Sequence, residues 1–112
     1  MTTYAQMAKD YVDGAGQLKT LIPEAWAGFS SLHGGAVSDG LLSKKVKELI
    51  AVAIGISDHC SGCIALHTKA AIHAGVSREE FAEMISVALL MGGGPASVYG
   101  IHALEAYDEF SA

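Results

Sequence analysis

The chain has 112 residues, enough for one small domain, and we expect residues 1–112 to fold as a single unit. Apolar residues make up 51% of it and charged residues 17%, which is too apolar for a disordered protein and suggests buried contacts between subunits. A net charge of −5 without clusters of Lys or Arg argues against nucleic acid and anionic membrane surfaces as partners.

Neither a membrane span nor a secretory leader is predicted. The longest apolar run, Leu49 to Ile56, is far shorter than the roughly 20 residues that cross a bilayer. Residues 1–4 lack the basic start and apolar stretch of a secretory signal, and the two cysteines are too few for a disulfide framework. We therefore expect a cytoplasmic protein.

Apolar residues recur with helical spacing between glycines, and no alternating strand pattern occurs, so we predict an all-α domain of about six helices. The first helix contains residues 4–12 and should end near residues 14–16, at a glycine. The second should begin at Pro23, which suits a first helical turn, and end at the glycine pair 34–35. Its predicted inner face is a mostly apolar stripe: Ala25, Trp26, Phe29, Leu32 and His33.

The third helix is predicted from Ser43, a suitable N-cap, to about Ser57. Apolar residues occur on almost every side of it, which is typical of a central, buried helix. The fourth helix should run from about His59 to Ala74, with Gly75 as its C-terminal stop.

The pattern of residues 77–80, Ser-Arg-Glu-Glu, is a capping box that opens a fifth helix. The glycine run 92–94 followed by Pro95 should end it, and a last helix should extend from about Pro95 to Phe110. The predicted inner stripe of the fifth helix consists of Phe81, Met84, Ile85, Ala88 and Leu89.

Both cysteines of the chain lie three residues apart at the start of the fourth predicted helix. His67 follows Cys63 by four residues, so Cys60, Cys63 and His67 should share one helix face. A helix N-terminus favours a thiolate, and the spacing allows the two sulfurs to form a disulfide without unfolding the helix. We therefore predict a redox-active cysteine pair.

Glu48 should face a packed neighbour of the third helix, because it shares a stripe with Ala51, Val52 and Gly55. In that position it could act as a base for a thiol, with His67 as the proton carrier. The alternative is an exposed ion pair with Lys44, four residues earlier. A glycine inside a helix costs roughly 1 kcal/mol relative to alanine, so Gly55 should have a packing reason.

The remaining histidines carry weaker signals. His59 directly precedes Cys60, where it could cap the helix or tune the cysteine pair. His33, His73 and His102 have no spacing that links them to the pair, and we predict structural roles for them.

The spacing of Glu48, Cys60, Cys63 and His67 resembles the signature of the alkylhydroperoxidase D-like group within the carboxymuconolactone decarboxylase superfamily. The likeness spans roughly residues 43–99. It includes Ala70-Ala71, the segment Gly75-Val76-Ser77-Arg78-Glu79-Glu80 and the step Gly94-Pro95.

This resemblance implies an all-helical fold with a two-helix catalytic core, assembled as a homotrimer or homohexamer. It also implies a thiol-dependent peroxidase or disulfide reductase without metal or organic cofactor. In that family the second cysteine, here Cys63, attacks the peroxide and the first, here Cys60, resolves it. The acid and the histidine, here Glu48 and His67, form a proton relay.

The sequence departs from that family in one respect. The best-characterised relay has a histidine directly before the second cysteine, where this chain has Gly62. A relay here must therefore be shorter, or must recruit His59 or water.

The expected partners are a small organic hydroperoxide and an external dithiol or protein disulfide reductant, which restores the cysteine pair. The helix dipole favours a thiolate on Cys60, whereas in the family the position of Cys63 attacks the peroxide. Which cysteine attacks first is therefore left open. One alternative is a zinc site made by Cys60, Cys63 and His67 with His59 or Glu48. The other is a non-catalytic helical assembly protein with an incidental redox pair.

Overall fold

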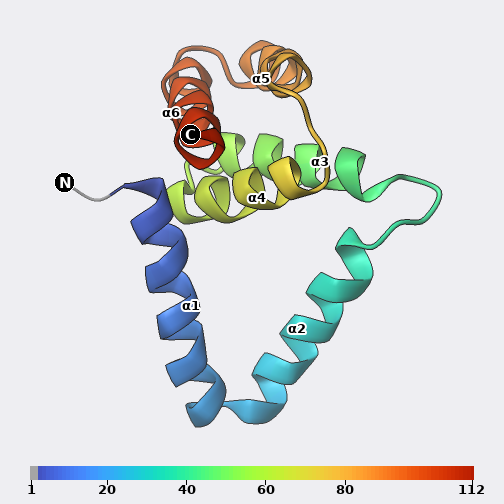
Figure 1. Ribbon diagram of the computed structural model, residues 1–112, viewed down its shortest axis with the longest axis vertical. Coiled ribbons are helices and arrows are strands. Elements are labelled where there is room, and N and C mark those ends of the chain that lie inside the picture. The colour runs from blue at the N-terminus through green and yellow to red at the C-terminus, as the bar shows by residue number, and fades with distance from the viewer. Residues whose placement is uncertain (1–2) are drawn as a thin grey trace.

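The computed structural model describes residues 3–112, which form six α-helices and no strand and so confirm the predicted all-α class (Figure 1). The helices are α1 (Tyr4–Leu21), α2 (Pro23–Val37), α3 (Lys44–Ser57), α4 (Ser61–His73), α5 (Arg78–Gly92) and α6 (Gly94–Ser111). The prediction about a leader concerns residues 1–4, of which Met1 and Thr2 lie outside the described residues. No helix among residues 3–112 has the length and apolar character of a membrane span.

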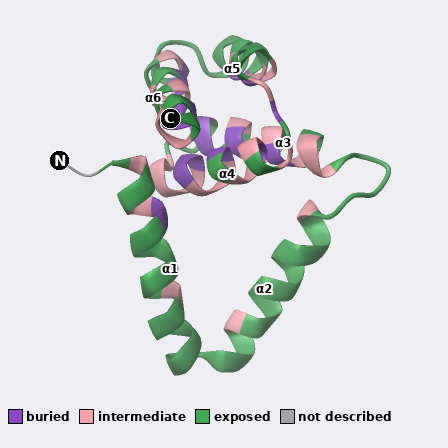
Figure 2. Ribbon diagram, in the orientation of Figure 1, coloured by how far each residue is buried: buried purple, intermediate pink, exposed green. Residues whose placement is uncertain are grey.

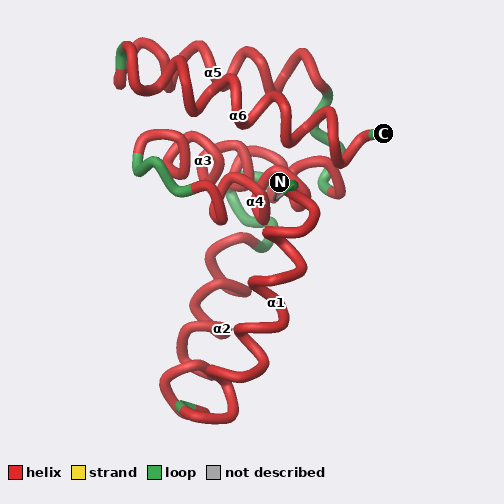
Figure 3. The backbone as a smooth tube through the Cα atoms, turned by 90° about the vertical axis from the view of Figure 1, so that its left-hand side faces the viewer, coloured by secondary structure: helices red, strands yellow, loops and turns green. Residues whose placement is uncertain are grey.

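The helices are arranged around the α3–α4 pair. α5 and α6 pack on one side of this pair, and α1 and α2 extend from the other side as an open V (Figures 1 and 3). Buried residues concentrate where α3, α4 and α6 meet, whereas most of α1 and α2 is exposed (Figure 2). The core is a cluster of Val52, Ile56, Ile64, Ala71, Val76, Phe81, Ala88, Ala96, Ala103, Ala106 and Tyr107. It fixes the junction between α3 and α4, where the cysteines lie.

The predicted end of the first helix was wrong. α1 continues past Gly14 and Gly16 to Leu21. Glycine makes a helix less favourable by about 1 kcal/mol relative to alanine, but helical backbone angles remain open to it. The break comes at Ile22, which leaves the α region (φ −132°, ψ 63°) because the following Pro23 disfavours helical angles in the residue before it.

The second helix also differs from its prediction. α2 passes through the glycine pair 34–35 and ends at Val37, because glycine also allows helical backbone angles. None of its residues is buried, so the predicted inner stripe was wrong for this chain: Phe29 and Leu32 are exposed. The apolar face of α2 borders the open V instead of a packed neighbour.

The predicted caps are confirmed. Ser43 caps α3 by accepting a hydrogen bond from the Val46 amide. Ser77 and Glu80 form the reciprocal capping box that opens α5. Gly75 ends α4 with a φ of 92°, which is in the region that favours glycine.

The third helix is central, as predicted, but it is only partly buried, which corrects the other half of that prediction. Glu48, Val52, Gly55 and Ile56 are buried, whereas Ile54 on the opposite face is 54% exposed. Within the predicted inner stripe of α5, Leu89 is likewise exposed. Apolar periodicity identified the helices but not which apolar faces this chain covers by itself.

Candidate active site

The junction of α3 and α4 places the first cysteine through backbone hydrogen bonds. The His59 amide donates to the Ile56 carbonyl (3.2 Å) and the Cys60 amide donates to the Gly55 carbonyl (2.9 Å). His59 has a φ of 54°, and these features together form a Schellman motif with histidine at the position where glycine is usual. Cys60 is therefore the last residue of the Schellman motif at the C-terminus of α3 and also the N-cap of α4.

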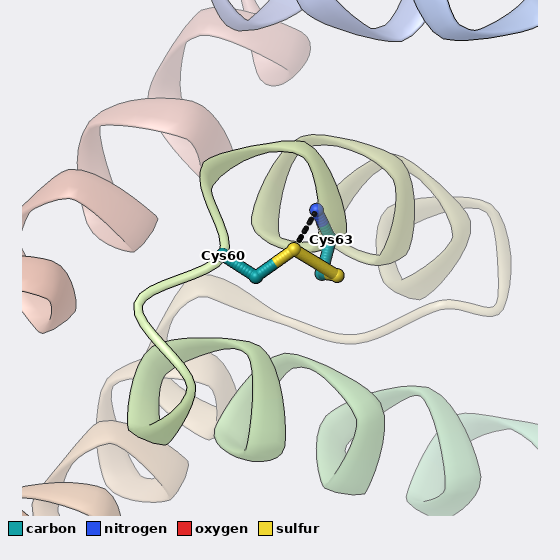
Figure 4. The surroundings of a disulfide bond; sticks show 2 residues. All are labelled: Cys60 and Cys63. Carbon is teal, nitrogen blue, oxygen red and sulfur yellow. Dashed lines mark hydrogen bonds between the residues drawn. A yellow bond between two sulfur atoms is a disulfide. The ribbon is translucent and has the colours of Figure 1, made fainter.

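Cys60 and Cys63 form a disulfide, with their Cα atoms 5.2 Å apart (Figure 4). The Cys63 amide also donates a hydrogen bond to Cys60 Sγ over 3.2 Å. The sulfur therefore occupies the place that a Ser or Asp oxygen takes in an ordinary N-cap. The sequence predicts Cys60 within the first turn of α4, whereas in the structure it lies just before that turn. The helix N-terminus directs a donor at this sulfur, which favours negative charge on it.

Gly55 brings α3 close to the cysteine pair. A Cβ at this position would lie 3.2 Å from the Cβ of Cys63 and 3.5 Å from the backbone nitrogen of Ile64. The first of these distances is shorter than ordinary carbon–carbon contact. The close approach of α3 to the start of α4 is the packing reason predicted for Gly55.

Glu48 is fully buried and its carboxylate has two partners. Oε1 lies 2.7 Å from His67 Nδ1, and Oε2 lies 3.1 Å from Lys44 Nζ. The two settings that the sequence left open therefore occur together: Glu48 faces a packed helix and also pairs with Lys44. The pair is not an exposed one, because only the lysine reaches solvent.

The contact with Glu48 orients the His67 imidazole. A carboxylate only accepts hydrogen bonds, so a neutral His67 carries its proton on Nδ1 and leaves Nε2 free. His67 follows Cys63 by one turn of α4, and residues at this spacing are neighbours on a helix surface. An acid, an imidazole and a thiol in this order can remove the thiol proton and so activate a nucleophile.

A cavity of about 600 Å³ opens beside the disulfide, between α4 and the two helices of the V. Its lining is mostly apolar. The residues that line it are Tyr11, Trp26, Phe29, Ser30, His33, Cys60, Gly62, Cys63, Leu66, His67 and Ala70. An apolar cavity with a few polar groups is the usual form of a small-molecule site.

His33 is a residue of this cavity that sequence reasoning missed. It extends from α2, and its ring centroid lies 5.8 Å from that of His67. Its helical spacing from Trp26 and Phe29 placed it on the same face of α2, and this was the available signal. Nothing in the sequence indicated that this face lies opposite α4.

His59 lies outside the cavity. Its ring stacks on Tyr99 of α6, with centroids 4.6 Å apart and planes 10° apart, and Tyr99 meets His102 edge-on at 5.3 Å. Of the predicted site residues, the structure therefore brings four together, namely Glu48, Cys60, Cys63 and His67, and places His59 against α6.

The zinc alternative requires Cys60, Cys63 and His67 to converge with His59 or Glu48. Within residues 3–112, no three side chains of Cys, His, Asp or Glu are arranged to hold a metal ion. Both carboxylate oxygens of Glu48 already have partners, His67 and Lys44, and His59 is stacked on α6. The geometry gives the zinc alternative no support.

Comparison with known proteins identifies the family. Residues 23–106 match the model of the carboxymuconolactone decarboxylase family. The chain belongs to the carboxymuconolactone decarboxylase family. A carboxymuconolactone decarboxylase family protein from Legionella pneumophila is 40% identical, with a TM-score of 0.95 over 97% of each chain. The family resemblance predicted from the sequence is thus confirmed.

Two curated relatives extend the family likeness. An uncharacterized protein of Cupriavidus necator is 37% identical over 97 residues, which are 87% of this chain and 86% of that protein. An uncharacterized protein encoded in the cox locus of Paracoccus denitrificans is 38% identical over 81 residues, 72% of this chain and 73% of that protein. The activity of this carboxymuconolactone decarboxylase family member must therefore be argued from its own site.

Proposed function

We propose that this family member is a thiol-dependent oxidoreductase that cycles Cys60 and Cys63 between dithiol and disulfide. Its substrate is a small organic hydroperoxide or a disulfide, and an external dithiol or protein disulfide reductant completes the cycle. The observation that carries the proposal is the disulfide at the wall of an apolar cavity, beside an imidazole that a buried carboxylate orients.

The peroxidase reaction begins with removal of the thiol proton. Glu48 holds the Nδ1–H of His67, and Nε2 accepts the proton of Cys63. The electron pair of the thiolate attacks the distal oxygen of the hydroperoxide, and the O–O bond breaks. Cys63 becomes a sulfenic acid, and the alkoxide takes up one proton to leave as an alcohol.

The second half of the cycle closes and reopens the disulfide. The thiolate of Cys60 attacks the sulfenic sulfur of Cys63, and hydroxide leaves as water after taking up a proton. One thiolate of the external dithiol then attacks Cys60 and forms a mixed disulfide. The second thiol displaces it, which oxidises the reductant and restores the cysteine pair.

The two cysteines have different surroundings, and these bear on the order of attack. Cys63 lies one turn from His67, which favours it as the attacking thiol. Cys60 receives the amide hydrogen bond at the helix N-terminus, which favours its thiolate and suits it to resolve the sulfenic acid. Cys63→Ser should then abolish sulfenic acid formation. Undiminished sulfenic acid on Cys60 in that variant would reverse the assignment.

The proposal is tested by the intact mass of the fully reduced chain before and after one equivalent of an alkyl hydroperoxide. We expect the loss of two hydrogens, mapped by alkylation to Cys60 and Cys63. Glu48→Gln should slow this step about 100-fold or more, because general base catalysis typically contributes that much. The exposed Glu83 on α5 provides a matched control, and Glu83→Gln should change nothing.

Thiols that stay fully alkylatable after peroxide treatment would refute the peroxidase reaction. Exchange with a small disulfide would then support a disulfide reductase. Failure of both reactions would favour the non-catalytic assembly protein.

Self-association and a cytoplasmic location remain predictions. The homotrimer or homohexamer implied by the family likeness is supported by the large apolar side chains that α1 and α2 expose. These include Val12, Leu18, Leu21, Phe29 and Leu32. Burial of such a surface in an oligomer would contribute roughly 25 cal/mol for each Å² of apolar area.

A further inference from the structure

We propose that His33 is a second catalytic histidine, which donates the proton to the leaving oxygen of the hydroperoxide. This inference rests on the proposed peroxidase function. It assigns to α2 a chemical role, whereas the sequence motif lies on α3, on α4 and on the N-cap of α4.

The first support is the position of His33 relative to the other reacting groups. Its ring centroid lies 5.8 Å from the ring centroid of His67, and both side chains line the cavity that the two cysteines border. Hydrogen bonds of nitrogen to oxygen measure about 2.9 Å, so imidazoles at this separation can contact one pair of bonded oxygens. A hydroperoxide offers such a pair.

The second support is the number of protons that the reaction moves. His67 is occupied: Nδ1 contacts Glu48, and Nε2 accepts the proton of Cys63 during the attack. The departing alkoxide is a strong base and needs a proton from a different group at that moment. One imidazole cannot accept a proton and donate another in the same step without an intervening exchange.

The third support is the chemistry of the remaining cavity lining. Apart from the two histidines and the cysteines, the protic groups there are the hydroxyls of Tyr11 and Ser30 and the indole N–H of Trp26. Of all lining side chains that can donate, imidazolium alone gives up its proton readily near neutral pH. Gly62 brings no side chain to the α4 side, and its position faces open space. The donor must therefore come from the opposite wall, where His33 lies.

The proton balance is then complete. The imidazolium of His33 donates to the proximal oxygen as the O–O bond breaks, and the alcohol leaves neutral. His33 is exposed on α2 and regains its proton from water, which receives the thiol proton that Cys60 loses when it forms its thiolate. His67 returns the proton taken from Cys63 to the hydroxide that departs when Cys60 closes the disulfide.

Two oxidants with different leaving groups test this role. tert-Butyl hydroperoxide expels a strongly basic alkoxide, whereas peracetic acid expels acetate, a weak base that leaves without a proton. Single-turnover oxidation of the reduced full-length chain is followed by stopped flow. We expect His33→Gln to slow the reaction with tert-butyl hydroperoxide about 100-fold, the lower end of general acid catalysis, and to leave the peracetic acid rate unchanged.

Two control variants test whether the effect is specific to His33. Ser31→Ala alters an exposed residue of α2 that does not line this cavity, and His73→Gln removes an exposed histidine outside it. Neither should change either rate. Because His33 is exposed, its replacement should leave the unfolding temperature unaltered, which is checked on the same preparations.

A loss that is equal for both oxidants would show that His33 only shapes the cavity, and would overturn the proposal. An unchanged rate with both oxidants would overturn it as well. If the unaltered chain reacts with neither oxidant, the proposed peroxidase function itself fails, and the role of His33 fails with it.

Discussion

The left-handed backbone at His59 allows a quantitative prediction. A residue other than glycine at a φ near 54° is disfavoured by roughly 1–2 kcal/mol. The stack on Tyr99 should stabilise the fold by about 0.5–1.5 kcal/mol, the range measured for aromatic pairs. His59→Ala keeps the strained backbone and loses the stack, so it should destabilise the fold by about 0.5–1.5 kcal/mol.

His59→Gly loses the same stack but removes the strain. Glycine gives up about 0.5–1 kcal/mol more backbone entropy on folding than alanine, which offsets part of this gain. The glycine variant should therefore be more stable than the alanine variant by roughly 1 kcal/mol, or about 4 °C in unfolding temperature for a domain of this size. Urea unfolding of the reduced chain, followed by circular dichroism, measures the difference.

A matched comparison at an ordinary helical position should have the opposite sign. Ala82 is exposed on α5, and Ala82→Gly should destabilise the chain by about 1 kcal/mol. If His59→Ala proves as stable as His59→Gly, the backbone at His59 is not strained and the reasoning is wrong. Tyr99→Leu combined with His59→Ala completes a double-mutant cycle for the stack.

Two further predictions concern packing and acid stability. Overpacking typically costs about 1–3 kcal/mol and the helix propensity of alanine offsets about 1 kcal/mol, so Gly55→Ala should destabilise the fold by up to about 2 kcal/mol in urea unfolding, because its Cβ would crowd the Cβ of Cys63. A more stable variant would show that α3 and α4 have room to separate. The hydrogen bonds from Arg78 hold the pKa of Asp108 below its ordinary value of 3.8. This pair therefore stabilises the fold above the unfolded-state pKa, and the contribution disappears as the pH falls through the lower folded-state pKa. Asp108→Asn should flatten the acid limb of the stability–pH curve, and an unchanged limb would contradict the assignment.

The features that sequence reasoning predicted well depend on residues close together in the chain. Caps at Ser43, Ser77 and Gly75 are each determined within one helical turn. The shared face of Cys63 and His67 follows from helical geometry alone. Glu48 reached His67 as expected because a buried stripe on α3 had to face the neighbouring helix.

The features that were missed depend on tertiary contacts or on unusual residues. His33 reaches the cavity only because α2 lies opposite α4, and no local pattern encodes that arrangement. The left-handed turn at His59 carries no glycine signal, and its stabilising partner Tyr99 is distant in the chain. The exposure of the apolar face of α2 was not predicted, because periodicity identifies an apolar stripe but not what covers it.

The sulfur of Cys60 is at once a redox centre and a helix cap, and these two roles are thermodynamically linked. As a thiolate it would accept a charge-assisted hydrogen bond from the Cys63 amide, which is stronger than the bond to a neutral disulfide sulfur. Oxidation weakens this cap and at the same time joins Cys60 covalently to Cys63. The first turn of α4 is therefore held by a charge-assisted hydrogen bond in the reduced protein and by a covalent ring in the oxidised one, so the redox state of the pair decides what anchors the helix that carries His67.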